Sequence, residues 1–152
     1  MSTRPTSDRL RETLFNVLAP RISGAAFLDL YAGSGAVGIE AISRGAAYVT
    51  FVERAPDAAR TLRDNLERLG IRSGFRIRAG SVKVFLTARS SNSGPKPVRY
   101  EVVFLDPPYD ADEEYTITLE LLGGRLPRIS LRVQLSLRNT GASKRSPSST
   151  AA

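Results

Sequence analysis

The sequence contains no cysteine, no histidine and no tryptophan in 152 residues. Without cysteine there is neither a disulfide framework nor a thiolate metal site, and without histidine zinc catalysis and every histidine-dependent triad are excluded. No apolar run approaches the roughly 18 residues that a membrane span requires, and the first residues lack the apolar core of a signal peptide. We therefore expect a cytoplasmic protein that binds neither a metal nor a membrane.

Acidic residues are missing from the last part of the chain. Residues 1–120 hold 16 Lys and Arg and all 15 Asp and Glu, a net charge of +1, whereas residues 121–152 hold six basic residues and no acid. Within the first part, residues 60–99 carry ten Lys and Arg against only Asp64 and Glu67. This stretch is compatible with a phosphate-facing surface, and a solvated arginine-rich face explains it equally well.

Apolar runs and helical periodicities alternate along the first 122 residues. A helix over 8–18, ended by Pro20, comes first. Strands are then expected at 26–31, 48–53, 75–79 and 100–105, and helices at 37–44, 56–69, 82–88 and 112–122. This alternation predicts an α/β fold with a doubly wound, mostly parallel, Rossmann-like sheet and helices on both faces.

The pattern changes after Gly124. Apolar and polar residues alternate over 129–137, which predicts a half-exposed strand rather than a buried parallel one. From Asn139 onward the Ser-, Ala- and Pro-rich composition predicts disorder. We therefore expect one catalytic domain over 1–124 and a divergent, basic, partly disordered segment over 125–152.

A glycine turn, Gly33-Ser34-Gly35, follows the first predicted strand. Ligands of open α/β sheets bind at this end of the strands, and glycine lets a ligand approach the backbone closely. With Gly38 the turn also satisfies the G-x-G-x-x-G pattern of dinucleotide sites, which leaves that alternative open. However, Asp29 would repel a pyrophosphate and suits a cationic amino-acid group, and Glu53 is placed to bind ribose hydroxyls. These features favour S-adenosylmethionine.

A second motif, Asp106-Pro107-Pro108-Tyr109, follows the strand at 100–105. The exocyclic amine of a nucleobase is a poor nucleophile because its lone pair is delocalised into the ring. The Asp106 carboxylate and the Pro107 carbonyl could accept hydrogen bonds from that amine, proline fixes the backbone, and Tyr109 could stack on the base. The alternative is a Pro-Pro turn that merely ends a strand. Methyl transfer to an amine needs positioning rather than a metal or a strong base, which suits this composition.

Four segments together resemble the bacterial 16S ribosomal RNA guanine-N2 methyltransferases: residues 4–16, 29–35, 51–53 and 104–109. The resemblance runs from about Arg4 to Leu122. It implies a class I S-adenosylmethionine-dependent methyltransferase that transfers a methyl group to the exocyclic N2 of a guanine in 16S ribosomal RNA. The implied partner is ribosomal RNA or the small ribosomal subunit.

The resemblance also implies roles for individual residues. Asp29, Gly33 and Gly35 would hold the amino-acid end of the donor, and Glu53 its ribose. The full set expected at the donor is Thr6, Asp29, Tyr31, Gly33, Gly35, Glu53, Arg54 and Ser81. The set expected at the target base is Arg9, Asp106, Pro107, Pro108 and Tyr109.

Three departures from the family pattern qualify these expectations. A basic β-hairpin that usually precedes the first motif is not found, Ser81 stands where an Asp near the adenine is expected, and no closing buried strands follow the fourth strand. An out-of-frame reading after Gly124 would explain the last departure. Missing strands would expose a sheet edge, so we expect low stability, as a monomer or weak dimer. Two alternatives follow: a remnant that binds donor and RNA without turnover, or a DNA amino-methyltransferase.

Overall fold

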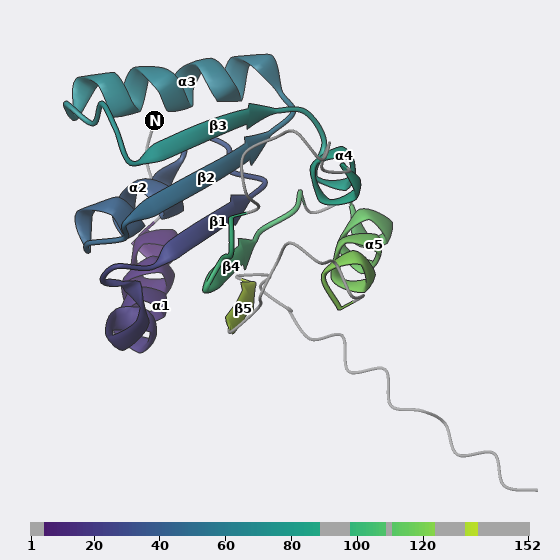
Figure 1. The fold of residues 1–152 in the computed structure, drawn as a ribbon, viewed down its shortest axis with the longest axis horizontal. Helices are drawn as coiled ribbons and strands as arrows, with labels where there is room; N and C mark the ends of the chain where they lie inside the picture. Colours follow the sequence, from purple (N-terminus) through teal and green to yellow (C-terminus); the bar gives the residue numbers. More distant parts are fainter. Residues whose placement is uncertain (1–4, 89–97, 109–110, 124–132, 137–152) are drawn as a thin grey trace, which may run out of the picture.

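The computed structural model describes residues 5–88, 98–108, 111–123 and 133–136. Its centre is a five-stranded sheet in the order β3-β2-β1-β4-β5, in which every neighbouring pair is parallel (Figure 1). The strands are β1 (Ala26–Leu30), β2 (Tyr48–Glu53), β3 (Phe75–Ala79), β4 (Val102–Leu105) and β5 (Val133–Ser136). The chain runs from the centre to one edge, then returns across β1 to the other side. This reversal creates a switch point between β1 and β4.

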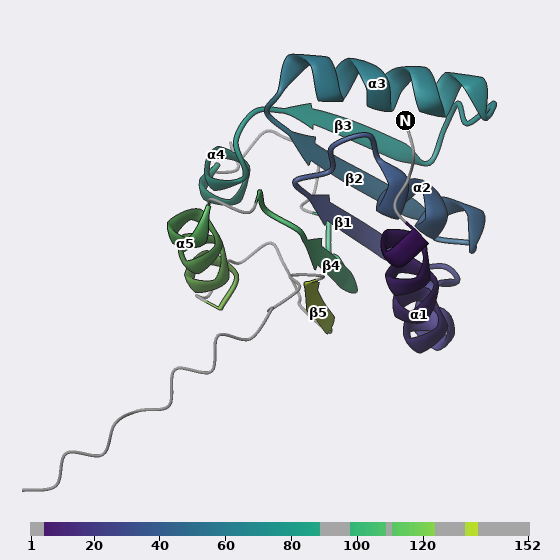
Figure 2. The same ribbon diagram turned by 180° about the vertical axis from the view of Figure 1, so that it is seen from behind.

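Helices cover both faces of the sheet (Figures 1 and 2). They are α1 (Pro5–Ile22), α2 (Ala36–Ser43), α3 (Pro56–Arg68), α4 (Val82–Thr87) and α5 (Asp112–Gly123). The first three pack on one face, and α4 and α5 pack on the other. The predicted doubly wound α/β sheet is therefore confirmed. Among the described helices, none combines the length and the apolar character needed to cross a membrane.

The alternation of side chains along the strands produces two separate cores. Phe27 of β1 and Phe51 of β2 pack toward α1–α3, and both are fully buried. Leu28 and Val52, their neighbours in sequence, point to the opposite face and pack toward α4 and α5, also fully buried. Each such side chain contributes roughly 1.5–3 kcal/mol through burial. Strands buried on both faces appear in the sequence as continuous apolar runs, which is why the pattern located them.

The prediction that Pro20 ends the first helix is wrong. Helix α1 extends from Pro5 to Ile22 and contains Pro20 in its last turn. Proline removes one backbone donor, so the hydrogen bond to the carbonyl of Asn16 is lost. Both Pro20 and Asn16 are exposed, and water can satisfy the freed carbonyl there. Burial of Leu18 and Ile22, at 2% and 1% exposed, keeps the last turn folded.

The expectation for the strand beyond Gly124 also needs correction. Residues 133–136 form β5, which pairs in parallel with β4, with Val102 in register with Val133. The alternating pattern suggested a strand unlike the buried parallel ones, but the free edge of β4 offers a full set of backbone partners to it. The boundary at residue 124 stays a prediction, and the expected disorder after Asn139 lies outside the described residues.

Candidate functional site

Three strand ends meet at the switch point of the sheet. Leu30 of β1 lies in register with Val52 of β2 and with Leu105 of β4. One residue further along, the same level of the sheet is occupied by Tyr31, Glu53 and Asp106. The topology therefore brings together the glycine turn and the Asp106 motif, which are 71 residues apart from Gly35 to Asp106, and it does so where open α/β sheets bind ligands.

Gly33 and Gly35 have different functions in the turn after β1. Both have positive φ, at 57° and 85°, a region that favours glycine. A Cβ added to Gly35 would lie 2.1 Å from Cδ1 of the buried Leu62, so this glycine allows α3 to pack against the turn. A Cβ added to Gly33 would meet nothing within 4 Å. Gly33 is therefore the position at which a ligand can approach the backbone.

The third glycine of the pattern, Gly38, is a packing residue. A Cβ there would lie 2.3 Å from the ring of Phe51, so its absence lets α2 lie directly on β2. The Gly38 N–H donates a hydrogen bond to Oδ2 of Asp29 at 3.0 Å. Packing within the protein thus explains Gly35 and Gly38, so the G-x-G-x-x-G spacing does not by itself indicate a dinucleotide.

Glu53 connects the end of β2 to the glycine turn. Its Oε2 accepts a hydrogen bond from the Gly33 N–H at 2.7 Å, and its Oε1 accepts one from the Ala55 N–H at 2.8 Å. A carboxylate can accept about four hydrogen bonds, so both oxygens keep capacity for ligand hydroxyls. The Glu53 carbonyl accepts from the Gly80 N–H at 3.1 Å, which places the turn before α4 beside the same residue.

Asp29 is the buried acid of the site, at 1% exposed. Its pKa is raised to about 7, mainly by burial; the Gly38 hydrogen bond lowers the pKa, and the charges of Asp106 and Glu53 contribute to raising it. The three carboxyl groups therefore lie close enough to influence one another, and they make the site electronegative. Such a site favours a cationic ligand over a pyrophosphate. Among the residues that the structure describes, no group of three or more acidic side chains is arranged so that it could hold a metal ion.

Tyr31 links the glycine turn to α5. It is the one non-glycine residue with positive φ in the described part of the chain, at 61°. Its hydroxyl hydrogen-bonds Oγ1 of Thr118 at 2.7 Å, and Thr118 is 1% exposed. Burial raises the pKa of Tyr31, while the Thr118 hydrogen bond lowers it. Because α5 follows the Asp106 motif, this bond couples the predicted donor site to the predicted base site.

The other predicted site residues differ in whether the structure places them near the glycine turn. Ser81 begins α4, and its Oγ accepts a hydrogen bond from the Val84 N–H at 3.2 Å. Arg54 is exposed, and its charge acts on the Tyr31 hydroxyl. Arg9 is exposed on α1, and no hydrogen bond or ion pair within the described ranges joins it to the glycine turn. Thr6 belongs to α1, and its side chain lies outside the described residues.

The Asp106 motif is described in part. Asp106 is exposed, Pro107 is buried, and the Pro108 carbonyl accepts a hydrogen bond from the Ala111 N–H at 3.1 Å. This bond forms a turn that leads directly into α5. Tyr109 lies outside the described residues, so its stacking on a base stays a prediction.

Two residues that hold the site together were missed by the sequence analysis. Thr118 binds Tyr31, and the Asn65 side chain donates to the Ser34 carbonyl at 3.0 Å. Each is a polar residue near the apolar stripe of its helix, which is the only signal that the sequence gives. The partner of such a residue depends on how helices are placed around the sheet, so it cannot be deduced from periodicity.

The fold defines the class of protein first. The protein SMU.776, solved in complex with SAH, shares this fold with a TM-score of 0.54, at 20% identity over 64% of this chain and 25% of that one. The fold is thus of the α/β methyltransferase type. The family described as Conserved hypothetical protein 95 matches residues 1–127, and the chain belongs to that family.

Two relatives from Escherichia coli place the chain more closely. Ribosomal RNA small subunit methyltransferase D of strain K12 is 43% identical over 106 residues, which are 70% of this chain and 50% of that protein. The solved structure of the protein yhhF is 40% identical, with a TM-score of 0.67 over 80% of this chain and 63% of that one. The family resemblance seen in the sequence is confirmed. The chain spans about half the length of the curated relatives it matches.

Proposed function

We propose that this chain is an S-adenosylmethionine-dependent methyltransferase that modifies the exocyclic N2 of a guanine in 16S ribosomal RNA. The observation that supports this most is the alignment of Glu53 and Asp106 on either side of Tyr31, at the ends of β2, β4 and β1. One motif suits a methyl donor and the other suits an amine. Their meeting at one level of the sheet is what a transfer between two bound molecules requires.

The residues present suit the donor. Gly33 leaves open space beside its backbone, and Glu53 keeps acceptor capacity for the ribose hydroxyls. When bound, S-adenosylmethionine supplies a methyl group activated by a positively charged sulfur. The negative charge of Glu53 and Asp106, joined by that of Asp29 above about pH 7, favours that cation and its ammonium group. The same charge disfavours the pyrophosphate of a dinucleotide, which is why we prefer the methyl donor. Asp29 also has a structural role, because its bond to the Gly38 N–H holds the first turn of α2 in place after the glycine turn.

Further donor contacts come from the flanking residues. The Ser81 hydroxyl already accepts a hydrogen bond from Val84, so it keeps its hydrogen for an acceptor such as an adenine nitrogen. An Asp at this place would instead accept from the adenine amine, so adenine recognition by this chain is weaker. Tyr31 and Arg54 border the turn, Gly35 shapes it, and we propose that Thr6 contacts the donor and Arg9 the target base from α1.

At the target base, Asp106 performs the main task. Its exposed carboxylate accepts a hydrogen bond from the guanine amine, and the Pro107 carbonyl accepts a second. These bonds localise the nitrogen lone pair and direct it toward the methyl group. Pro108 shapes the turn through the Ala111 bond, and Tyr109 stacks on the base. A base that starts within a helix is first extruded into the site.

A second candidate function is supported by one observation. Ser81 leaves the adenine of the donor without a carboxylate partner, which favours a domain over residues 1–124 that binds donor and RNA without turnover. A DNA amine is the third candidate, because the Asp106 motif suits any amine on a base.

One set of assays distinguishes these three candidates. We expect donor binding by calorimetry and transfer of a labelled methyl group to undermethylated small ribosomal subunits. Transfer that is competed by ribosomal RNA and not by DNA supports the proposal. Donor binding without any transfer favours the non-catalytic domain, and preferential transfer to DNA favours the third candidate.

A further inference from the structure

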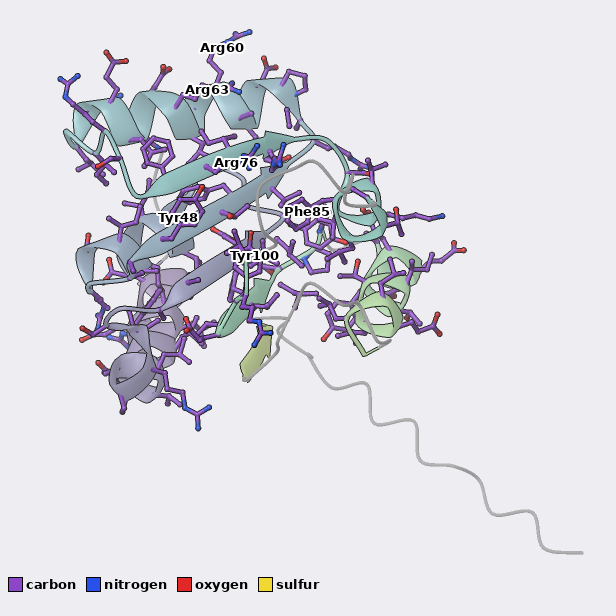
Figure 3. All side chains as sticks on the ribbon, viewed as in Figure 1. Tyr48, Arg60, Arg63, Arg76, Phe85 and Tyr100 are labelled. Carbon is purple, nitrogen blue, oxygen red and sulfur yellow. The ribbon has the colours of Figure 1, made fainter. Side chains whose placement is uncertain are left out.

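The free edge of the sheet at β3 carries exposed arginines from two elements. Strand β3 is the last strand on its side of the described sheet. Arg76 and Arg78 of β3 and Arg60 and Arg63 of α3 are all exposed. Figure 3 shows Arg60 and Arg63 on α3 and Arg76 on β3. Phe75 and Ile77 pack on the α3 side of the sheet, so Arg76 and Arg78 lie on its opposite face. We refer to these four residues as the edge arginines.

These cations have little internal compensation. Arg60 lies 3.6 Å from Asp57, with side chains 72% and 96% exposed, so this pair is worth little. For Arg63, Arg76 and Arg78, no carboxylate lies within ion-pair distance among the residues that the structure describes. Arginines that hold neither a partner nor a helix in place remain available to an anionic ligand.

Arg76 and Arg78 point to the same face of the sheet. They are two residues apart, so their backbones lie roughly 6.6 Å apart along the strand. Arg76 is in register with Thr50, whose side chain hydrogen-bonds the Tyr100 hydroxyl at 2.8 Å. Burial raises the pKa of Tyr100, the Thr50 hydrogen bond opposes this, and the charges of Arg78 and Arg76 oppose it as well. Both cations therefore lie near one point on the sheet.

The row of arginines leads to the site. Arg78 is in register with Val52, and the next pair is Ala79 with Glu53. The Gly80 N–H then binds the Glu53 carbonyl. A chain of phosphates that follows β3 toward its carboxyl end therefore arrives beside Glu53, and the row of strand ends continues from there through Tyr31 to Asp106, where the target base is proposed to be held.

We propose that the edge arginines, above all Arg76 and Arg78, bind the phosphates of a single-stranded RNA segment and guide it to the site at the ends of β1 and β4. This inference rests on the proposed function for its choice of RNA. Arginine suits the task because its planar fork binds phosphate oxygens with two parallel hydrogen bonds. A different reason for charge at an edge strand is protection against pairing with another chain, and the test distinguishes the two.

The test compares double variants that remove the same charge from different places. Arg76→Gln with Arg78→Gln neutralises the edge, and Arg76→Lys with Arg78→Lys keeps its charge. Arg21→Gln with Arg68→Gln is the matched control, because both residues are exposed in the last turn of a helix, α1 and α3, and neither lies on β3. Binding of a fluorescently labelled single-stranded RNA of mixed sequence is measured by anisotropy across a salt series. Circular dichroism melts and sedimentation monitor folding and association.

The edge Gln variant should bind the RNA about tenfold more weakly, with the slope of log K against log salt smaller by roughly 1.4. The Lys variant and the control should keep the slope of the parent. Equal losses in the edge variant and the control overturn the proposal, because the effect is then one of net charge. An unchanged RNA affinity together with new dimers assigns the arginines to edge protection and also overturns it. The proposal is also overturned if the edge arginines bind polyglutamate tightly but do not bind RNA, because they would then recognise an acidic peptide.

Failure of the proposed function has a different signature. If the parent chain binds RNA through Arg76 and Arg78 but neither binds S-adenosylmethionine in calorimetry nor transfers methyl groups, the proposed function fails and this inference stands. If the parent methylates ribosomal subunits and the edge Gln variant does so with an unchanged KM and RNA affinity, this inference fails and the function stands.

Discussion

The carboxylate of Asp29 accepts a hydrogen bond at 3.0 Å from the backbone N–H of Gly38, which fastens the middle of β1 to the first turn of α2. The bond lies in the core, since Asp29 is 1% exposed. A helix N-terminus stabilises an anion, yet burial dominates and raises the pKa of Asp29 from 3.8 to about 7. Ionisation of Asp29 therefore costs free energy in the folded protein.

This cost predicts a pH-dependent stability. The folded protein holds a proton on Asp29 up to about pH 7, whereas the unfolded chain releases it near pH 4. The stabilisation from Asp29 is thus complete below about pH 4 and is lost as the pH rises to 7. Asp29→Asn stays neutral throughout. Its free energy of unfolding relative to the parent should rise between pH 4 and pH 8, by at most about 4 kcal/mol.

Urea unfolding of both proteins at pH 4, 6 and 8 measures this difference. A constant offset between Asp29→Asn and the parent would show that Asp29 ionises normally. The proposed function adds a second readout, because loss of the negative charge should weaken binding of S-adenosylmethionine at pH 8 even where the variant is more stable.

Three glycine-to-alanine substitutions separate ligand approach from packing. Gly33→Ala and Gly70→Ala both place Ala at positive φ in open space, so each should cost about 1–2 kcal/mol of stability. Only Gly33→Ala should also reduce donor affinity, by roughly tenfold or more, because its methyl group enters the proposed donor site. Gly35→Ala meets Leu62 and should cost about 3 kcal/mol. Thermal melts and calorimetry give both quantities, and equal donor affinity in Gly33→Ala and Gly70→Ala would remove Gly33 from the site.

Glu53 is predicted to serve both the turn and the donor. Glu53→Gln replaces one acceptor oxygen by an amide that faces a backbone N–H, at Gly33 or at Ala55. We expect a loss of about 1–2 kcal/mol in stability and a donor Kd raised roughly ten- to hundredfold, because charged hydrogen bonds are lost. Glu67→Gln, an exposed acid of α3, is the control. A donor Kd that matches this control would restrict Glu53 to the turn.

A double-mutant cycle tests the bond between Tyr31 and Thr118. Tyr31→Phe removes the Tyr31 partner of the buried Thr118 hydroxyl, and Thr118→Val removes the same bond from Tyr31, whose hydroxyl also interacts with Glu114. Each should cost about 1–2 kcal/mol, and the two together should cost about 1 kcal/mol less than the sum. Urea unfolding measures the coupling. Simple additivity of the two losses would mean that the hydroxyl groups do not depend on each other.

The sheet was predictable because its strands are buried on both faces. Residues 48–53 and 75–79 were located to the residue, and the helix that begins at Pro56 was recognised from its proline and its apolar stripe. Local rules failed where tertiary contacts dominate. The last turn of α1 survives Pro20 because Leu18 and Ile22 are buried, which no local pattern shows.

The convergence of the candidate site residues was predictable to a similar depth. Strand ends in a parallel sheet meet at one edge, so Gly33, Glu53 and Asp106 could be expected to converge before their positions were known. The contacts of Thr118 and Asn65 could not, because each depends on where a helix packs relative to the turn. The burial of Asp29 and its bond to Gly38 were not predicted either, and contact between Asp29 and the donor stays a prediction.

The central claim concerns Asp106 and is tested most directly by methyl transfer. A labelled methyl donor is incubated with undermethylated small ribosomal subunits and either the parent chain or Asp106→Ala, with donor affinity measured in parallel. We predict transfer by the parent to one guanine, and a loss of roughly hundredfold or more in Asp106→Ala with donor affinity little changed. Full transfer by Asp106→Ala, or no transfer by a parent chain that binds the donor, would contradict the account.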